Sequence, residues 1–366
     1  MVNAKKIFIC LFLIFVSVGI VFSSGKKDAK ESVQTQEVPV DTIETVVVEE
    51  EVVEEPKAPE TVAISISALN GPSGIPMAYM FENPPVIEGA NVSFEISAGA
   101  DVLLPKLLKG EVDIGILPPN VAAKVYTKNK GALVIGAVVG QGMIQVITRD
   151  KEIRTLADLK GKTVNVAGQG ATPEYIFRYL LNKNSIEIAA DGQEPTENTV
   201  ALDFSIPAAE LAPAIISNRI EYAVVPEPFV TVATSKDSAI VAAIDLQKEY
   251  RAVEAAEGLE NYPMTVVVIN STFAKNHPEM VRQILAFYKD AIDWTNNNAT
   301  KAGVLVQSHT LGLMAPIAAK VIPRGAYVYQ SAQDARGDLE KLFEIFMSFS
   351  PEAVGGSLPD DGFYFN

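Results

Sequence analysis

The sequence predicts an α/β protein of two lobes, each a mixed β-sheet flanked by helices, from three observations. The chain has 366 residues, more than the ~250–300 residues at which one hydrophobic core stops growing. From Thr61 onward, segments typical of strands alternate with segments typical of helices, which indicates α/β layers. The pattern of GEVDIGILPPNVA (110–122) recurs 108 residues later in NRIEYAVVPEPFV (218–230). A unit that occurs twice fits two similar lobes.

The N-terminus is typical of an export signal. Lys5 and Lys6 precede the apolar run Ile7–Phe22, and small residues follow at 23–25. We therefore expect residues 1–25 to be a signal peptide. An uncleaved anchor is the alternative, because the apolar run approaches the about 20 residues of a membrane span. Either way, the body would be exported and would work in the periplasm or on the outer face of the cytoplasmic membrane.

Residues 26–60 are expected to form an acidic, flexible tether. They hold eleven acidic and four basic residues, without aromatic residues or glycine, so they bury too little to offset the entropy lost on ordering. The single cysteine, Cys10, lies inside the apolar run, so the exported body would have no disulfide and no thiol chemistry. Ser23 and Ser24 stand where a lipoprotein signal would place its cysteine, so the sequence assigns no lipid anchor.

The composition argues against nucleic acid as a partner. The formal net charge is −15, and no basic run occurs outside the N-terminus, whereas phosphate contacts need clustered lysine and arginine. Hydrophobic residues make up 48% of the chain, which is enough for a full core. The body is therefore expected to be an ordinary, mildly acidic globular protein.

Runs rich in β-branched and aromatic residues, bounded by turn residues, predict the strands. These runs are 61–69, 92–97, 112–117, 132–139, 143–149, 163–167, 220–225 and 264–270. Segments with apolar residues at helical spacing predict the helices. They are 75–82, 101–110, 155–161, 174–184 and 207–217, and the chain after Asn270 is expected to be mostly helical.

The repeated unit gives a first indication of a binding site. Each copy is a helix, a tight turn, a buried strand and a polar loop with prolines, Pro118–Asn120 or Pro226–Pro228. Ligands of open α/β sheets bind beyond the carboxyl ends of the strands, and proline stiffens a loop by fixing φ. Two lobes facing each other would therefore point Asn120 and Glu227 into one cleft. The alternative is that the prolines only end the strands.

Two glycine-rich loops each follow a strand and precede a helix. LNGPSGIP (69–76) places Ser73, and AGQGATPE (167–174) places Thr172, just before the expected helix. A helix start readily holds a carboxylate, sulfonate or phosphate. Neither loop matches a dinucleotide fingerprint or a P-loop, so nucleotide binding is not expected. Turn glycines and helix caps are the alternative explanation of both loops.

Five segments in this order resemble the solute-binding components of ABC importers of the nitrate, sulfonate, taurine and thiamine-precursor type. The resemblance covers about residues 61–366, and its specificity comes from the ordered set. The segments are 109–115, 155–164, 168–175, 224–230 and 273–281.

This resemblance implies a type II periplasmic-binding fold, with two lobes joined by two crossing segments and a ligand in the cleft. We expect crossings near 148–152 and 261–265, a first lobe of 61–148 plus 266–366, and a second lobe of 149–265. The implied function is capture of a small polar organic ligand by hinge closure and its delivery to an ABC permease. The protein is expected to be a monomer without a cofactor.

The resemblance also implies which positions contact the ligand. These are Asn70, Gly71, Ser73, Gly74, Asn120, Gln141, Gly142, Gly168, Gln169, Gly170, Thr172 and Glu227. Tyr175 and Tyr262 are expected to supply ring faces, with lobe packing as the alternative. No Lys or Arg lies in these loops, which favours a zwitterionic, amide-bearing or nitrogen-heterocyclic ligand over a strongly anionic one.

An enzyme is the rival class, because the same fold also hosts enzymes of thiamine-precursor and menaquinone synthesis. The only histidines, His277 and His309, belong to no metal-spaced pair and no nucleophile set, so surface or capping positions are expected for them. No catalytic residue, metal site or cofactor is therefore predicted. A surface sensor with the same fold would differ only in its partner and stays open.

Overall fold

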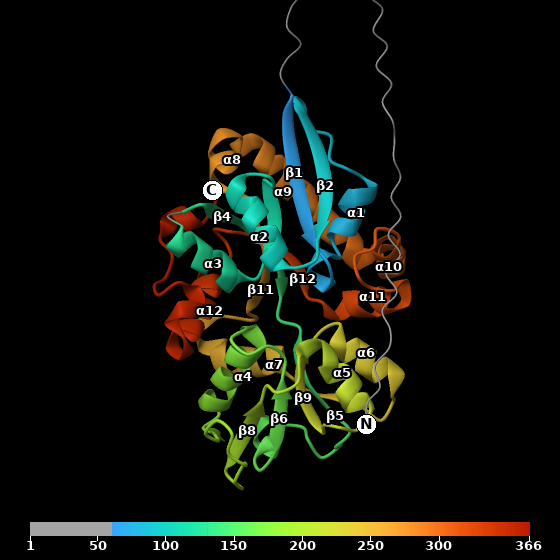
Figure 1. Cartoon of the computed structure of the whole chain (residues 1–366), viewed down its shortest axis with the longest axis vertical. Coiled ribbons are helices and arrows are strands. Elements are labelled where there is room, and N and C mark those ends of the chain that lie inside the picture. Colours follow the sequence, from blue (N-terminus) through green and yellow to red (C-terminus); the bar gives the residue numbers. More distant parts are fainter. Residues whose placement is uncertain (1–60, 130) are drawn as a thin grey trace, which may run out of the picture. The chain divides into compact units, whose positions relative to one another are not determined.

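The computed structural model describes residues 61–129 and 131–366 (Figure 1). The expected signal peptide, 1–25, and the expected tether, 26–60, lie outside the described residues. Within the described ranges, no helix is both long and apolar enough to cross a membrane.

Two six-stranded sheets form the framework, and each mixes parallel with antiparallel pairs. Parallel pairing joins β1 to β2 and β3, and antiparallel pairing joins β11 to β3 and β4. This confirms the predicted α/β class with two mixed sheets. The spatial order of the first sheet is β12 (Tyr327–Ser331), β4 (Leu133–Gln141), β11 (Pro263–Asn270), β3 (Ile114–Leu117), β1 (Val62–Leu69) and β2 (Ala90–Ser97).

The second sheet shows that the first predicted crossing was placed too late in the chain. Residues 144–148 were expected in the first lobe, but as β5 they pair with β9 and β10 of the second sheet. The chain therefore leaves the first sheet at Gln141 and enters the second at Ile144. The spatial order of the second sheet is β10 (Val241–Asp245), β5 (Ile144–Thr148), β9 (Tyr222–Pro226), β6 (Thr163–Val166), β8 (Thr199–Asp203) and β7 (Glu187–Ile188).

Helices cover both sheets, and most follow a strand directly. Those associated with the first sheet are α1 (Met77–Glu82), α2 (Ala100–Lys109), α3 (Pro119–Lys128), α8 (Ser271–Asn276), α9 (Pro278–Asn297), α10 (Ala299–Ser308), α11 (Ala315–Val321) and α12 (Arg336–Phe349). Those associated with the second sheet are α4 (Thr172–Lys183), α5 (Ala208–Ile216), α6 (Phe229–Lys236) and α7 (Leu246–Glu254). The region after Asn270 was expected to be mostly helical, but it also contains β12, which pairs with β4.

The repeated sequence unit corresponds to a repeated structural unit, α2–β3–α3 and α5–β9–α6 (Figure 1). β3 lies between parallel β1 and antiparallel β11, and β9 lies between parallel β6 and antiparallel β5. The aligned residues Gly110 and Asn218 both adopt positive φ, 70° and 60°. Glycine and asparagine are the residues that commonly end a helix in this conformation, which explains why they align.

The C-terminal helix α12 contacts helices beside both sheets. It packs against α3 beside the first sheet and against α4 beside the second. The main hydrophobic core accordingly contains buried residues of both sheets, such as Ile66 and Val164, together with Phe346 of α12. The two lobes therefore share one continuous core along α12.

Candidate functional site

The loop after β1 carries four predicted contact residues within 70–74. Its conformation requires glycine: Gly71 has a φ of 109°, and a Cβ atom on Gly74 would lie 2.3 Å from the carbonyl oxygen of Leu69. The amide of Gly71 donates to the carbonyl of Leu311 at 2.9 Å. The loop is thereby fixed against the segment that precedes α11.

Tyr327 of β12 contacts this loop, and sequence reasoning missed it. Its hydroxyl donates to the carbonyl oxygen of Pro72 at 2.8 Å. The side chain is buried, and burial raises the pKa of Tyr327 well above its ordinary value, with a further contribution from the negative charge of Glu227. Tyr327 therefore anchors the loop after β1 to β12. The alternating YVY in a region expected to be helical was the only sequence signal for it.

Glu227 directly follows β9 and is only 3% exposed. Its Oε2 accepts the amide proton of Thr231 at 3.0 Å, at the start of α6. Among the described residues, Oε1 of Glu227 has no hydrogen-bond partner. Burial raises the pKa of Glu227, although the side chain and amide of Thr231 and the charge of Arg324 oppose the shift. Buried polar atoms normally have partners, so the open oxygen of Glu227 needs an explanation.

A basic side chain from outside the predicted contact loops faces Glu227. Arg324 ends the short 3-10 helix η4 (Ile322–Arg324), and its Nη1 lies 3.8 Å from Oε1 of Glu227. Near it in the chain, Lys320 donates to Oγ of Ser235 at 3.2 Å. The sequence did not identify either residue, because each lies about a hundred positions from its partner in the chain. Only the tertiary structure brings them together.

Gln141, Gly142 and Tyr262 form the crossings between the sheets. Nε2 of Gln141 donates to Oε1 of Gln330 at 3.0 Å. A Cβ atom on Gly142 would lie 2.4 Å from the ring of Tyr262, so only glycine fits there. Tyr262 is fully buried, and its hydroxyl donates to Oε1 of Gln247 at 3.0 Å. Its ring therefore supports the crossing and offers no open face to a ligand.

The loop before α4 was expected to offer free amide groups to an anion. Gly168 and Gly170 do adopt positive φ, 78° and 74°, and Thr172 begins the helix as a buried residue. The amide of Gly170, however, donates to Oε2 of Glu174 at 2.6 Å, and Arg178 donates to the other oxygen at 2.7 Å. The helix start thus holds a carboxylate of its own chain.

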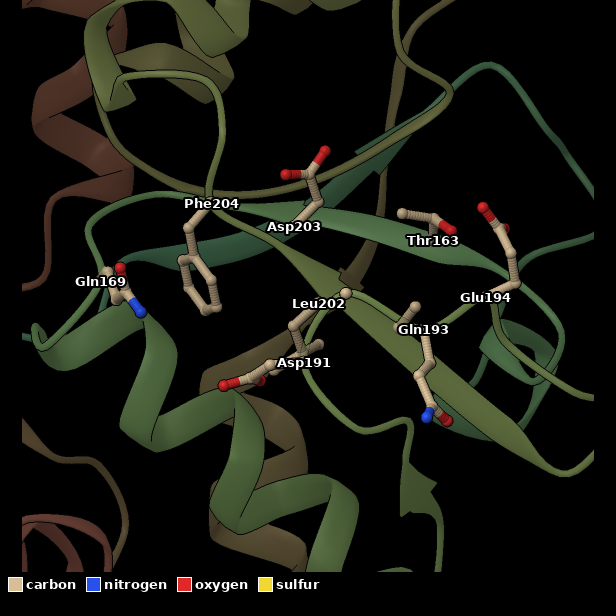
Figure 2. A pocket seen from close by; sticks show the side chains of 10 residues that line it. Thr163, Gln169, Asp191, Gln193, Glu194, Leu202, Asp203 and Phe204 are labelled. Carbon is tan, nitrogen blue, oxygen red and sulfur yellow. The ribbon is translucent and has the colours of Figure 1, made fainter.

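Gln169 is exposed and lines a cavity of about 390 Å³ beside β6 and β8 (Figure 2). Phe204 and Asp203 line the same cavity, together with two other acidic residues. Neither Glu227 nor Arg324 does. The structure therefore does not place Gln169 with the Glu227 group.

Tyr175 of α4 packs against two phenylalanines of α12. Its ring centroid lies 4.7 Å from that of Phe346 and 5.9 Å from that of Phe349, and the residue is 7% exposed. These contacts favour the alternative considered for Tyr175, packing between the lobes.

Asn120 lies within a helix rather than in a loop. Pro118 precedes α3, and Pro119 is its first residue, so Asn120 is half-buried in the first helical turn. A proline suits the first helical position because that position needs no amide donor. Pro119 therefore starts a helix in the first copy of the repeat, whereas Glu227 of the second copy lies between β9 and α6.

Among the described residues, no group of three or more His, Cys, Asp or Glu side chains could hold a metal ion. His277 stands at the junction of α8 and α9, and His309 follows α10 and contacts Glu82 at 3.1 Å. Both histidines occupy the helix-end positions expected for them.

Comparison with known proteins identifies relatives of this fold. The model of the NMT1-like family matches residues 77–307, more than half of the chain. A search of curated proteins finds no significant match.

Solved structures with the same fold come from several organisms. An ABC transporter protein of Parabacteroides distasonis shares 24% identity, with a TM-score of 0.67 over 83% of this chain and 98% of that one. The periplasmic aliphatic sulphonate-binding protein of Escherichia coli shares 16%, with a TM-score of 0.63 over 84% and 92%. The periplasmic nitrate-binding protein of Synechocystis shares 13%, with a TM-score of 0.55 over 81% and 85%. These matches confirm the predicted two-lobed periplasmic-binding fold.

Proposed function

Because the chain belongs to the NMT1-like family, we propose that it is the extracytoplasmic solute-binding component of an ABC importer. It captures a small polar organic ligand between its lobes and delivers it to a membrane permease. Solved proteins of the same fold that bind sulphonate and nitrate support this function. The export signal expected at residues 1–25 fits work outside the cytoplasm.

One observation carries the proposal, the incompletely bonded carboxylate of Glu227. It lies at the carboxyl end of a central strand, where open α/β sheets bind ligands. It faces Arg324 of the other lobe, and its Oε1 lacks a donor within the described part of the chain. An unsatisfied buried acceptor costs about 1–3 kcal/mol. A ligand that donates to Oε1 recovers this free energy, and Glu227 is therefore the proposed centre of the site.

The proposed ligand carries nitrogen and is zwitterionic, amide-bearing or nitrogen-heterocyclic. Oε1 of Glu227 accepts its N–H groups. The loop after β1, held by Tyr327, supplies a wall from the first lobe. Asn120 contributes from the first turn of α3.

Binding is proposed to act through lobe closure. The crossings lie near residues 142–143 and before β11, which gives a first lobe of 61–141 plus 263–366 and a second lobe of 144–262. A ligand that contacts both lobes shifts an equilibrium between open and closed forms. The protein is proposed to act as a monomer.

Native mass spectrometry of the purified full chain tests this function. We expect a co-purified small molecule that contains nitrogen and that raises the melting temperature when added back. A ligand at a hundred times its Kd adds about 2.7 kcal/mol to stability, a shift that melting curves resolve. A chain that carries no small molecule and whose melting no solute of this class changes would contradict the proposal.

A further inference from the structure

We infer that the guanidinium of Arg324 is an internal cation at the Glu227 end of the site, and that a cationic nitrogen group of the ligand displaces it. Ammonium, amidinium and guanidinium groups belong to this class. The inference rests on the proposed function, because it defines which group of the ligand the Glu227 carboxylate recognises.

The contact between Arg324 and Glu227 is unusually loose for a buried carboxylate. Paired guanidinium and carboxylate groups usually form two parallel hydrogen bonds of about 2.7–2.9 Å. Here Nη1 and Oε1 are 3.8 Å apart, and Oε1 accepts no hydrogen bond from the described residues. Arg324 thus balances the charge of Glu227 without satisfying its open oxygen.

The exposures of the two side chains differ in a way that favours exchange. The side chain of Glu227 is fully buried, whereas that of Arg324 is 49% exposed. Releasing a half-exposed guanidinium into water costs little, because the attraction of a solvent-exposed ion pair is weak. A ligand cation that bonds directly to Oε1 forms a charge-assisted hydrogen bond at a desolvated site. Exchange of the internal cation for the ligand's cation is therefore favourable.

Thr231 holds the other oxygen of the carboxylate. Its amide donates to Oε2 of Glu227 at 3.0 Å, so Oε1 is the oxygen left for the incoming group. A cationic nitrogen group can donate a hydrogen bond to this oxygen. An anion would instead meet the buried negative charge of Glu227, which disfavours it.

The neighbouring Lys320 offers a matched control. It precedes Arg324 by four residues and also reaches α6, but its partner there is the neutral Ser235. Lys320→Gln therefore removes a basic side chain from the same segment without exposing a buried carboxylate. It separates general loosening of the α11–α6 contact from competition at Glu227.

Calorimetric titration of benzamidine, benzamide and benzoate into the full chain tests the inference, because these probes share a shape and differ in charge. We expect benzamidine to bind about tenfold more tightly to Arg324→Gln than to the wild type, as when an internal competitor fills the site about nine-tenths of the time. Lys320→Gln should change its affinity less than about twofold. Glu227→Gln should abolish its binding, and benzamide and benzoate should bind each protein more weakly.

Three results would overturn the inference. The first is benzoate binding that Arg324→Gln abolishes, which would make Arg324 an anion receptor. The second is an equal gain in Arg324→Gln and Lys320→Gln. The third is the absence of benzamidine binding to Arg324→Gln, because a vacated buried carboxylate has to accept an amidinium. The proposed function is judged separately, since a co-purified ligand without a cationic nitrogen would support the function and refute the inference.

Discussion

Two buried glutamates of the second lobe, Glu254 and Glu227, face basic residues of the first lobe but differ in how fully they are bonded. Glu254 of α7 is 1% exposed and lies 2.9 Å from Nζ of Lys341 on α12. It also accepts the hydroxyl proton of Tyr179 and lies 3.8 Å from Nζ of Lys183. Glu227, in contrast, has one open oxygen and a single cation at 3.8 Å.

The difference shows which contact between the lobes is structural and which is available to a ligand. Although partial burial opposes the charge of Lys341, hydrogen bonds to Glu257 and Glu254 raise its pKa, so Lys341 stays charged beside Glu254. This Glu254 cluster fixes α12 to the second lobe. The contact between Glu227 and Arg324 leaves Oε1 of Glu227 without a hydrogen bond. Glu227 can therefore exchange Arg324 for a group of the ligand.

The largest expected effect is at the Glu254 cluster. Lys341→Met removes the closest cation from a buried carboxylate, which should lower the free energy of unfolding by about 3 kcal/mol. Urea unfolding of the full chain measures this loss. Lys320→Met, which removes an exposed lysine, should cost less than about 0.5 kcal/mol. If Lys341→Met and Lys320→Met lower the free energy of unfolding equally, the Glu254 cluster does not stabilise the fold in the way described.

Gly142→Ala tests whether the crossing beside α7 is as tightly built as the Glu254 cluster. The added Cβ atom would lie 2.4 Å from the ring of Tyr262, and overpacking of this kind costs about 1–3 kcal/mol. Gly337→Ala is the control, because no atom lies within 4 Å of its added Cβ and alanine is the better helix former by about 1 kcal/mol. Thermal melting should therefore shift down for Gly142→Ala and not for Gly337→Ala.

Glu227→Gln should change stability less, and by an amount that depends on pH. Burial raises the pKa of Glu227 above its ordinary value of 4.5, so the folded state binds this proton more tightly than the unfolded state does. The resulting stabilisation is fully present below the unfolded pKa and is lost as pH rises through the raised value. Relative to wild type, the variant should therefore gain stability at neutral pH. Urea unfolding from about pH 4 to about pH 8 checks this, and a pH-independent difference would argue against a perturbed Glu227.

Asn120→Ala is expected to have the smallest effect on stability. Asn120 is half-buried in the first turn of α3, and such substitutions usually change the free energy of unfolding by less than about 0.5 kcal/mol. If Asn120 contacts the ligand, its loss should weaken binding by about 0.5–1.5 kcal/mol. Calorimetry with the co-purified ligand measures this change, and unchanged affinity would place Asn120 outside the site.

Much of the fold could be predicted from sequence because its signals are local. The repeat predicted equivalent strands, and β3 and β9 do occupy equivalent positions in the two sheets. The first crossing was misplaced because residues 143–149 have a pattern typical of a strand, and periodicity cannot tell which sheet a strand joins. β12 was missed because it is a five-residue edge strand within a helical region.

The candidate site was less predictable because its partners come from distant parts of the chain. Glu227 was identified from its place in the repeat, and the structure places Arg324, which no local motif marks, beside it. The loop before α4 shows the opposite case, since its glycines suggested an anion site that Glu174 fills. A helix start can be recognised in a sequence, but whether its amides are free depends on the neighbouring side chains.

Calorimetric titration of the co-purified ligand into Glu227→Gln, alongside its unfolding curve, tests the central claim most directly. The claim is that the buried carboxylate of Glu227 contributes to ligand binding and does not stabilise the fold. A hydrogen bond to a charged group is worth about 1.5–3 kcal/mol, so affinity should fall by about 10- to 150-fold while the free energy of unfolding at neutral pH stays level or rises. A variant that unfolds early and binds the ligand normally would contradict the account, because Glu227 would then serve the same structural role as Glu254.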